Sequence, residues 1–329
     1  MSDEETNAAD RGRSAAKPSG IPARGWKDIV WRVFKRFFDD RIGLIAAGVA
    51  FYILLGLFPA LTAFVSLYGF LFDPQTIAEQ VSYLRGLLPS GGIEVIREQL
   101  QSLASQDRNT LSIGFAAALL VAFWSANNGV KTLFEAVNVA YRESEKRSIL
   151  KTNIIAFAFT VGAMMLIALM AVSAGIVPLV LSFLHLDRLS ESIIVFGRWP
   201  IIFVVVVFSI SLIYRFGPSR APAKWRWISW GSVLATTVWI AASAAFSFYL
   251  QNFANYNATY GSLGAAIGLM LWAWLSALIL IVGAEVNAEM EHQTTSDSTT
   301  GEPQPMGKRG AVVADTLGRS FGGSTDHPE

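Results

Sequence analysis

Polar side chains recur on one side of a predicted membrane helix, and their spacing indicates a binding surface. At about 100° per residue, six of them fall within an arc of about 100° on one helical face: Trp124, Asn127, Asn128, Lys131, Glu135 and Asn138. Amide, ammonium and carboxylate groups are costly in lipid, so they are expected to face a bundle interior or a wet cavity. The pattern predicts a polar lining for a substrate path. Interhelical hydrogen bonding followed by an ordinary cytoplasmic extension is an equally open alternative.

Two acidic residues extend this predicted network. Glu135 stands four residues after Lys131, so the two side chains can neutralise each other on one helix. Glu285 is expected at the cytoplasmic rim of the last apolar stretch, where an ion pair with Lys131 or Arg215 is the favoured role. The other candidates for a substrate path or an intramembrane polar network are Tyr52, Pro59, Tyr260 and Asn287.

Catalytic chemistry finds little support among the residue types. The three histidines are scattered, and no His/Asp/Glu cluster has metal-ligand spacing. The chain contains no phosphate-loop motif, no G-x-S-x-G elbow and no cysteine. A net charge of +1 provides no global basic field for nucleic acid. The sequence therefore predicts a protein that is not an enzyme, has no metal or other cofactor, and does not bind nucleic acid.

Long apolar stretches must position these residues. Between Arg226 and Glu285 the chain runs 58 residues without Lys, Arg, Asp, Glu or His. A bilayer core about 30 Å thick is crossed by roughly 20 apolar residues in a helix. The predicted fold class is all-α, a polytopic membrane helix bundle. Its six transmembrane helices are expected at 43–72, 111–130, 152–183, 199–215, 228–250 and 262–284.

The distribution of positive charge predicts the orientation of the chain. Of the 26 Lys and Arg residues, 21 lie in the N-terminal segment, the second and fourth connections and the C-terminal tail. Five lie in the alternate connections. The positive-inside rule then places both termini in the cytoplasm, as an even number of spans also requires. The expected location is the bacterial inner (plasma) membrane.

Residues 26–38 have the pattern of an amphipathic helix. Apolar side chains recur there at i, i+3, i+4 and i+7, which predicts a helix lying in the cytoplasmic interface of the membrane. A soluble cap packed on the bundle is the alternative. The cations expected to face anionic lipid head groups are Lys27, Arg32, Lys35 and Arg36.

The flanking segments complete the predicted domain organisation. The connection 73–110 divides at 89–92 into two helical patterns, which predicts a helical hairpin on the outer face. Residues 1–24 are expected to be a disordered cytoplasmic N-terminus, and 25–291 form the transmembrane domain. Residues 292–329 are rich in Ser, Thr, Gly and Pro and are expected to be a disordered cytoplasmic tail.

Seven short runs carry a family resemblance. They are 46–60, 124–129, 138–141, 214–218, 260–264, 271–272 and 283–289. In combination these runs resemble the YihY/virulence factor BrkB family of membrane proteins, over about 25–291. That family has been labelled ribonuclease BN-like, and some members are linked to serum resistance or envelope lipopolysaccharide. The resemblance implies a multi-pass protein with a role in the bacterial envelope.

The predicted function is transport or placement of a lipid or envelope precursor. An amphiphile needs a mixed polar and apolar route, whereas a small ion would need a ring of charges that this chain lacks. The expected partners are membrane lipids, among them an anionic lipid or a lipopolysaccharide precursor. A non-catalytic membrane scaffold or regulator is the first alternative. A ribonuclease is disfavoured, because phosphodiester hydrolysis requires metal ligands or a positioned acid/base set.

Overall fold

Helices form every long element in the described part of the chain. The computed structural model describes residues 10–71, 108–184, 188–252 and 263–322. Six helices of 28 to 36 residues each overlap one predicted span. They are α3 (Ile42–Leu71), α6 (Arg108–Ala140), α7 (Ile149–Leu184), α8 (Arg188–Phe216), α9 (Trp225–Asn252) and α11 (Leu263–Glu291).

Length and hydropathy identify membrane-spanning stretches in part of this set. Among the described residues, Ile149–Leu166, Trp225–Leu250 and Ala266–Glu291 are long and apolar enough to cross a bilayer. The number rises to four if α2 (Ala23–Asp39) and the first part of α3, which are bent by 65°, form one broken span. The predicted total of six spans therefore stays a prediction.

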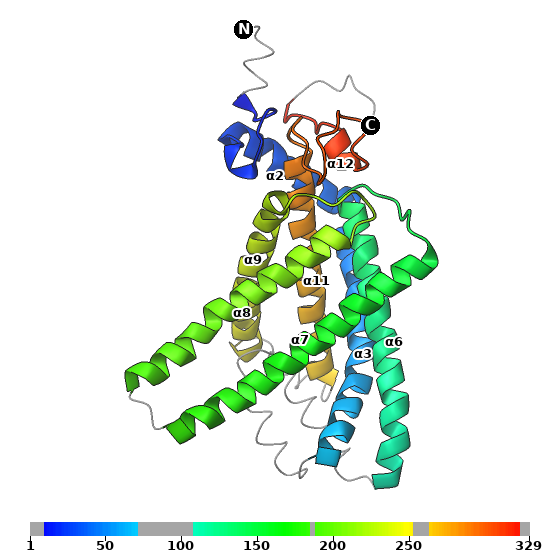
Figure 1. Ribbon diagram of the computed structural model, residues 1–329, viewed down its shortest axis with the longest axis vertical. Helices are drawn as coiled ribbons and strands as arrows, with labels where there is room; N and C mark the ends of the chain where they lie inside the picture. Colours follow the sequence, from blue (N-terminus) through cyan, green and yellow to red (C-terminus); the bar gives the residue numbers. More distant parts are fainter. Residues whose placement is uncertain (1–9, 72–107, 185–187, 253–262, 323–329) are drawn as a thin grey trace.

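Helix α11 lies at the centre of the bundle. In Figure 1, α3 and α6 run side by side, α9 and α11 stand beside them, and α7 and α8 lean away from the other helices. Buried Ala277 and Ile281 of α11 pack with Ile42 and Ala46 of α3. Farther along, α11 joins a second apolar cluster with α6, α8 and α9. One helix thus links both halves of the core.

A close crossing joins α9 to α11. A Cβ atom added to Gly231 would lie 2.5 Å from the Asn287 side chain and closer still to the Gly283 carbonyl oxygen. A Cβ at Gly283 would meet the Cβ of Ala235 at 2.8 Å. Only glycine permits backbones to approach this closely, as in other small-residue contacts between membrane helices.

The amphipathic helix α2 is bound more tightly to the bundle than its sequence pattern predicts. Its exposed apolar side chains, Val30, Phe34 and Phe38, follow one another at four-residue spacing and are each more than 60% exposed. The cations do not all point to the surroundings, because Arg32 is buried against α11 and Arg36 reaches the same helix. The exposed apolar stripe supports an interfacial position, while the buried face has the character of a packed cap.

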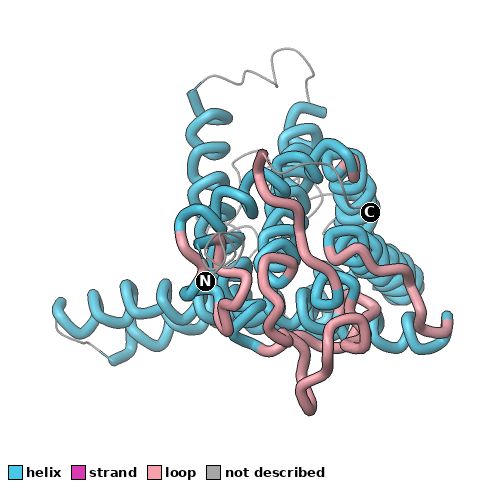
Figure 2. Tube along the Cα trace, turned by 90° about the horizontal axis from the view of Figure 1, so that it is seen from above, coloured by secondary structure: helices cyan, strands magenta, loops and turns pink. Residues whose placement is uncertain are grey.

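Both ends of the described chain lie at the same end of the bundle (Figure 1). Composition predicted disorder for 1–24 and 292–329, whereas the described residues of these segments form specific contacts. Arg13 donates to the Gly318 carbonyl at 2.6 Å, and the Thr295 amide donates to the Arg13 carbonyl at 2.7 Å. Seen from above, the loops gather over the helix ends (Figure 2). These hydrogen bonds join the described parts of the two terminal segments, and the disorder predicted for 1–24 and 292–329 stays a prediction.

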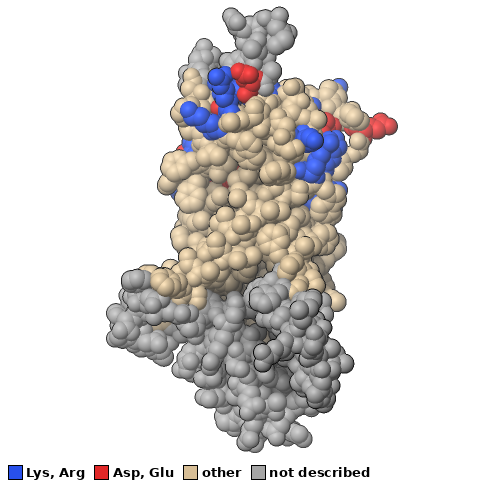
Figure 3. Space-filling model, turned by 90° about the vertical axis from the view of Figure 1, so that its left-hand side faces the viewer, with Lys and Arg blue, Asp and Glu red and all other residues tan. Residues whose placement is uncertain are grey.

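Charged side chains gather at one end of the described surface in Figure 3. Lys, Arg, Asp and Glu side chains gather near the end that holds the termini, and the adjoining surface in Figure 3 is made of other residue types. The short helices η1 (Pro18–Gly20) and α12 (Val312–Asp315) lie in the two terminal segments. Most of the predicted outer-face hairpin, residues 73–107, lies outside the described residues.

Candidate functional site: a buried ionic cluster and a basic pocket

Glu289, near the C-terminal end of α11, is the centre of a buried ionic cluster. Its carboxylate accepts hydrogen bonds from Arg32 Nε of α2 and from Arg142 Nη2 at 3.1 Å, and Arg36 Nε lies 3.7 Å away. His292 Nδ1 lies 3.3 Å from the same carboxylate. Because Glu289 is fully buried, these groups replace the water that an ionised carboxylate needs. The cluster connects α2 and the α6–α7 connection to α11.

A second buried ion pair joins the α8–α9 connection to the end of α11. Arg220 Nη2 donates to Glu291 Oε2 at 2.7 Å, and the Ser298 hydroxyl donates to the same oxygen at 2.5 Å. The Arg220 guanidinium also lies 4.9 Å from the centre of the Tyr141 ring. Both charges are almost completely buried. This arrangement fixes the connection and the start of the tail together.

Glu285 does not form the ion pair predicted for it. Its side chain is fully buried, and neither carboxylate oxygen has a hydrogen-bond partner among the described residues. Its cationic neighbours are Arg36 and Arg142, and not Lys131 or Arg215. The physical reason is direction, since Lys131 donates toward α7 and Arg215 toward the α8–α9 connection. Helix α11 places Glu285 near α2 and the end of α6.

The polar residues of α6 do not share one buried face. Trp124 is 59% exposed, and Glu135 is also exposed. The Asn127 Oδ1 atom is buried and has no hydrogen-bond partner in the described structure. Lys131 Nζ donates to Asn153 Oδ1 of α7 at 3.2 Å. The predicted pair between Lys131 and Glu135 is absent from the described ion pairs, because the lysine turns to the neighbouring helix.

The two remaining asparagines of this pattern have different surroundings. Asn128 is half-buried, and its backbone carbonyl accepts a hydrogen bond from Thr132 Oγ1 at 3.0 Å. Asn138 is buried, and its Oδ1 accepts from the Ser219 amide at 2.7 Å. Its Nδ2 donates to Glu145 Oε2 at 3.3 Å. Asn138 therefore holds two connections in place at the end of α6.

The other predicted site residues are distributed over α3 and α11. Tyr52 and Pro59 are half-buried in α3. Asn287 Oδ1 accepts from the Gly231 amide at 2.8 Å, and its Nδ2 donates to a second α9 backbone group at 3.0 Å. Both ends of this amide are thus used between helices. Tyr260 lies outside the described residues.

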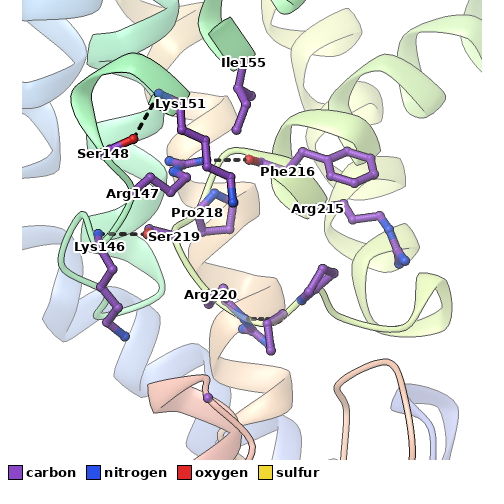
Figure 4. Close-up of a pocket in the computed structure, with 13 residues that line it drawn as sticks. Lys146, Arg147, Ser148, Lys151, Ile155, Arg215, Phe216, Pro218, Ser219 and Arg220 are labelled. Carbon is purple, nitrogen blue, oxygen red and sulfur yellow. Dashed lines mark hydrogen bonds between the residues drawn. The ribbon is translucent and has the colours of Figure 1, made fainter. Parts of the chain in front are cut away.

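A pocket of about 550 Å³ lies between the start of α7 and the α8–α9 connection (Figure 4). None of its 13 lining residues is acidic. Its cationic lining residues are Lys146, Arg147, Lys151, Arg215 and Arg220. Clustered cations of this kind attract anions.

Arg147 holds one wall of this pocket in place. Its guanidinium donates to both Glu145 oxygens, at 2.8 and 2.6 Å, and lowers the pKa of that carboxyl to about 2. It also donates to the carbonyls of Phe216 and Gly217, at 3.0 and 2.7 Å. Glu145 stays ionised at neutral pH, so most of the Arg147 charge is compensated.

Comparison with known proteins places this arrangement in a family. The family model described as Virulence factor BrkB matches residues 33–307. The chain belongs to the Virulence factor BrkB family. The resemblance seen in the short sequence runs is thereby confirmed, and the family's curated members include proteins named as membrane proteins.

Individual relatives of this BrkB-family chain are similar over most of their length. It is 32% identical to the "Putative ribonuclease-like protein YfkH" of Bacillus subtilis (strain 168), over 74% of this chain and 88% of the relative. It is 27% identical to a UPF0761 membrane protein of Aeromonas salmonicida (strain A449), over 78% of this chain and 86% of the relative. A UPF0761 membrane protein of Haemophilus influenzae (strain 86-028NP) is 23% identical, over 78% and 93%. No solved structure matches the chain.

The most highly connected polar residues of this BrkB-family protein were not predicted as site residues. Glu289, Arg32 and His292 form the ionic cluster, and the basic connections form the pocket. The sequence does contain a signal for the cluster. Glu285, Glu289 and His292 recur at helical intervals, which indicates that they share one side of the end of α11. Apart from Lys131 and Arg215, the expected partners of Glu285, the lysines and arginines of the connections served only to predict orientation. Within the described residues, no group of three or more His, Cys, Asp or Glu side chains could hold a metal ion.

Proposed function

We propose that this BrkB-family membrane protein moves or places a lipid or lipid-linked envelope precursor in the bacterial inner membrane. The observation that carries the proposal is the position of Lys131 and Asn127 on α6. Lys131 is half-buried between α6 and α7, and the Asn127 side-chain oxygen is buried without a partner in the described structure. Polar groups in such apolar helices are costly and usually mark a pathway or a binding site.

An amphiphilic substrate also fits the surroundings of these residues. Apolar side chains are exposed along α7 and α8, among them Ile154, Phe157 and Phe208. The basic pocket lies at the ends of the same two helices. A molecule with an anionic head group and acyl chains matches both surfaces. We therefore propose membrane lipids, in particular an anionic lipid or a lipopolysaccharide precursor, as partners. With both termini in the cytoplasm, the pocket would face the inner leaflet.

A non-catalytic scaffold or regulator is the second candidate function. The specific observation in its favour is the buried ionic cluster around Glu289, which joins α2, the α6–α7 connection and α11. A nuclease is not favoured, because within the described residues no group of three or more His, Cys, Asp or Glu side chains could hold the metal ion that phosphodiester hydrolysis commonly uses. The ribonuclease-like name belongs to the B. subtilis relative. We propose that this chain has no enzymatic activity.

Lipid exchange in reconstituted vesicles tests the proposal. Vesicles with the protein are expected to redistribute a fluorescent anionic phospholipid between leaflets several-fold faster than empty vesicles. Asn127→Leu and Asn128→Leu should each slow this exchange, because each removes an amide from the polar part of α6.

A matched control is Thr237→Val on α9. Thr237 is exposed, and its hydroxyl donates only to the Val233 carbonyl of its own helix. This variant should exchange lipid at the wild-type rate. If neither phospholipids nor glycolipid precursors bind or move, the scaffold function replaces lipid movement.

A further inference from the structure

The pocket at the start of α7 contains two cations that no carboxylate neutralises. Lys146, Arg147 and Arg220 pair with acidic side chains behind the pocket wall. Lys151 and Arg215 have no acidic side chain within ion-pair distance in the described structure. Lys146, Arg147 and Arg220 are therefore neutralised parts of the pocket wall. Lys151 and Arg215 supply its uncompensated positive charge.

Arg215 is held in a fixed position at the edge of this pocket. Its Nη1 donates to the Ala223 carbonyl. Its guanidinium lies 4.8 Å from the centre of the Trp225 ring, which stacks on Phe208 with a centroid separation of 6.1 Å. Nε and Nη2 have no hydrogen-bond acceptor within the described residues. An arginine with a fixed plane and free N–H groups is suited to two-point recognition of a phosphate group.

Lys151 supplies a second unpaired charge at the same pocket. It lies in the first turn of α7, its side chain is exposed, and its Nζ has no partner in the described chain. Figure 4 shows it extending between Arg147 and Pro218 into the pocket. In Figure 4 the Arg215 guanidinium points away from Lys151, so the two cations line the pocket from different sides. The long lysine side chain is the one that can adjust to phosphate oxygens in more than one position.

The surface next to the pocket is strongly apolar. Ile149 and Leu150, at the start of α7, are 84% and 71% exposed. Trp225 and Phe208, on the α8 and α9 side, are 45% and 54% exposed. Tryptophan beside basic residues is typical of the boundary between head groups and acyl chains. A free phosphate ion would use the cations only, whereas a phospholipid would use both surfaces.

We propose that this pocket binds the phosphate of a lipid head group, with Lys151 and Arg215 as the direct ligands. The acyl chains would lie along the exposed apolar residues at the start of α7 and beside Trp225. The inference rests on the proposed lipid function and names the substrate class as phosphate-bearing lipids. The carboxylates paired with Arg147 and Arg220 neutralise these two cations. The pocket wall therefore keeps its structure when no lipid is bound.

Binding of defined lipids to the purified full-length protein tests the proposal. The probes are short-chain phosphatidic acid, diacylglycerol with the same chains, and inorganic phosphate. Wild type should bind phosphatidic acid at least about tenfold more tightly than diacylglycerol. Lys151→Glu should remove this preference, because it replaces the free cation with a repelling charge. Arg215→Gln should weaken it as well.

The matched control is Lys308→Glu, which makes the same charge change on an exposed residue of the tail that does not line the pocket. It should bind like wild type. Lys151→Met, which is less disruptive than Lys151→Glu, should show an intermediate loss. Equal binding of diacylglycerol and phosphatidic acid would overturn the proposal, as would wild-type binding by a folded Lys151→Glu protein. Full competition by inorganic phosphate at comparable concentration would overturn the lipid assignment.

The binding experiment and the vesicle exchange experiment test the pocket and lipid movement separately. Selective binding of phosphatidic acid without accelerated exchange in vesicles would support the pocket and reject movement. Accelerated exchange that is unchanged by Lys151→Glu, together with no binding preference, would support movement and reject the pocket.

Discussion

At the residue scale, the described structure concentrates its buried charge around one carboxylate. Glu289 contacts three guanidinium groups, whereas Glu285, one turn earlier on the same helix, has no hydrogen-bond partner among the described residues. A buried ion pair adds little net stability compared with apolar packing, but loss of one member leaves an uncompensated charge. The cluster is therefore expected to be sensitive to single substitutions.

Glu289→Gln should destabilise the protein strongly. The substitution leaves Arg32, Arg36 and Arg142 without their shared counter-charge, a change that typically costs about 3–5 kcal/mol. Thermal unfolding in detergent, followed by tryptophan fluorescence, measures the effect. Glu135→Gln is the control, since Glu135 is exposed and forms none of the described ion pairs. Equal midpoints for the two variants would show that the cluster is not a stabilising unit.

Lys131 and Glu135 should respond differently to substitution. Lys131→Met removes the hydrogen bond to Asn153 between α6 and α7 and should reduce both stability and lipid exchange. Glu135→Ala should stay within about 0.5 kcal/mol of wild type, as exposed substitutions usually do. Unfolding midpoints and exchange rates of the two variants check this. A strong effect of Glu135→Ala would instead support the ion pair that the spacing of Lys131 and Glu135 predicts.

His292 should make stability depend on pH. Burial lowers the pKa of His292, although Glu289 opposes this shift. The unfolded chain, with a histidine pKa near about 6.5, then binds more protons than the folded chain as pH falls. The stability contribution is therefore present above about pH 6.5 and is lost on acidification. The unfolding midpoint should fall between pH 7.5 and 5.5, and less so in His292→Asn.

At the element scale, the close crossing of α9 and α11 depends on glycines, which have no Cβ atom. Gly231→Ala should force the two helices apart, because its Cβ would overlap Asn287 and the Gly283 carbonyl. Overpacking of this kind typically costs about 1–3 kcal/mol. Gly162→Ala in α7 is a matched control, since a Cβ there meets nothing within 4 Å. Unfolding midpoints should fall for the first variant and stay level or rise for the second.

At the scale of the whole molecule, the first and last described residues lie at one end, and the charged side chains visible in Figure 3 gather near it. The charge bias predicts that this end is cytoplasmic. Because the chain has no cysteine, single introduced cysteines can report its orientation. In intact cells, a cysteine at Asn255 should react with an impermeant thiol reagent, and one at Ala221 should react only after lysis. The reverse pattern would invert the predicted topology.

The six long helices could be predicted from the sequence alone, because an uninterrupted apolar run of this length has few alternatives to a helix. The family could also be recognised from short local runs such as 283–289. The direction of individual polar side chains could not be predicted. Lys131 has two acceptors within reach, Glu135 on its own helix and Asn153 on the next, and only the packing of α6 against α7 decides between them.

The sequence by itself determined the helical membrane fold, the gathering of positive charge in alternate connections and the absence of a catalytic motif. These properties depend on composition and on periodicity within one segment. Only the tertiary structure decided that described residues of the two terminal segments contact each other, that Glu289 meets Arg32 257 residues away, and that two basic connections form one pocket. Contacts between distant segments depend on how helices cross and turn. Those angles follow from packing across the whole bundle, which no single segment encodes.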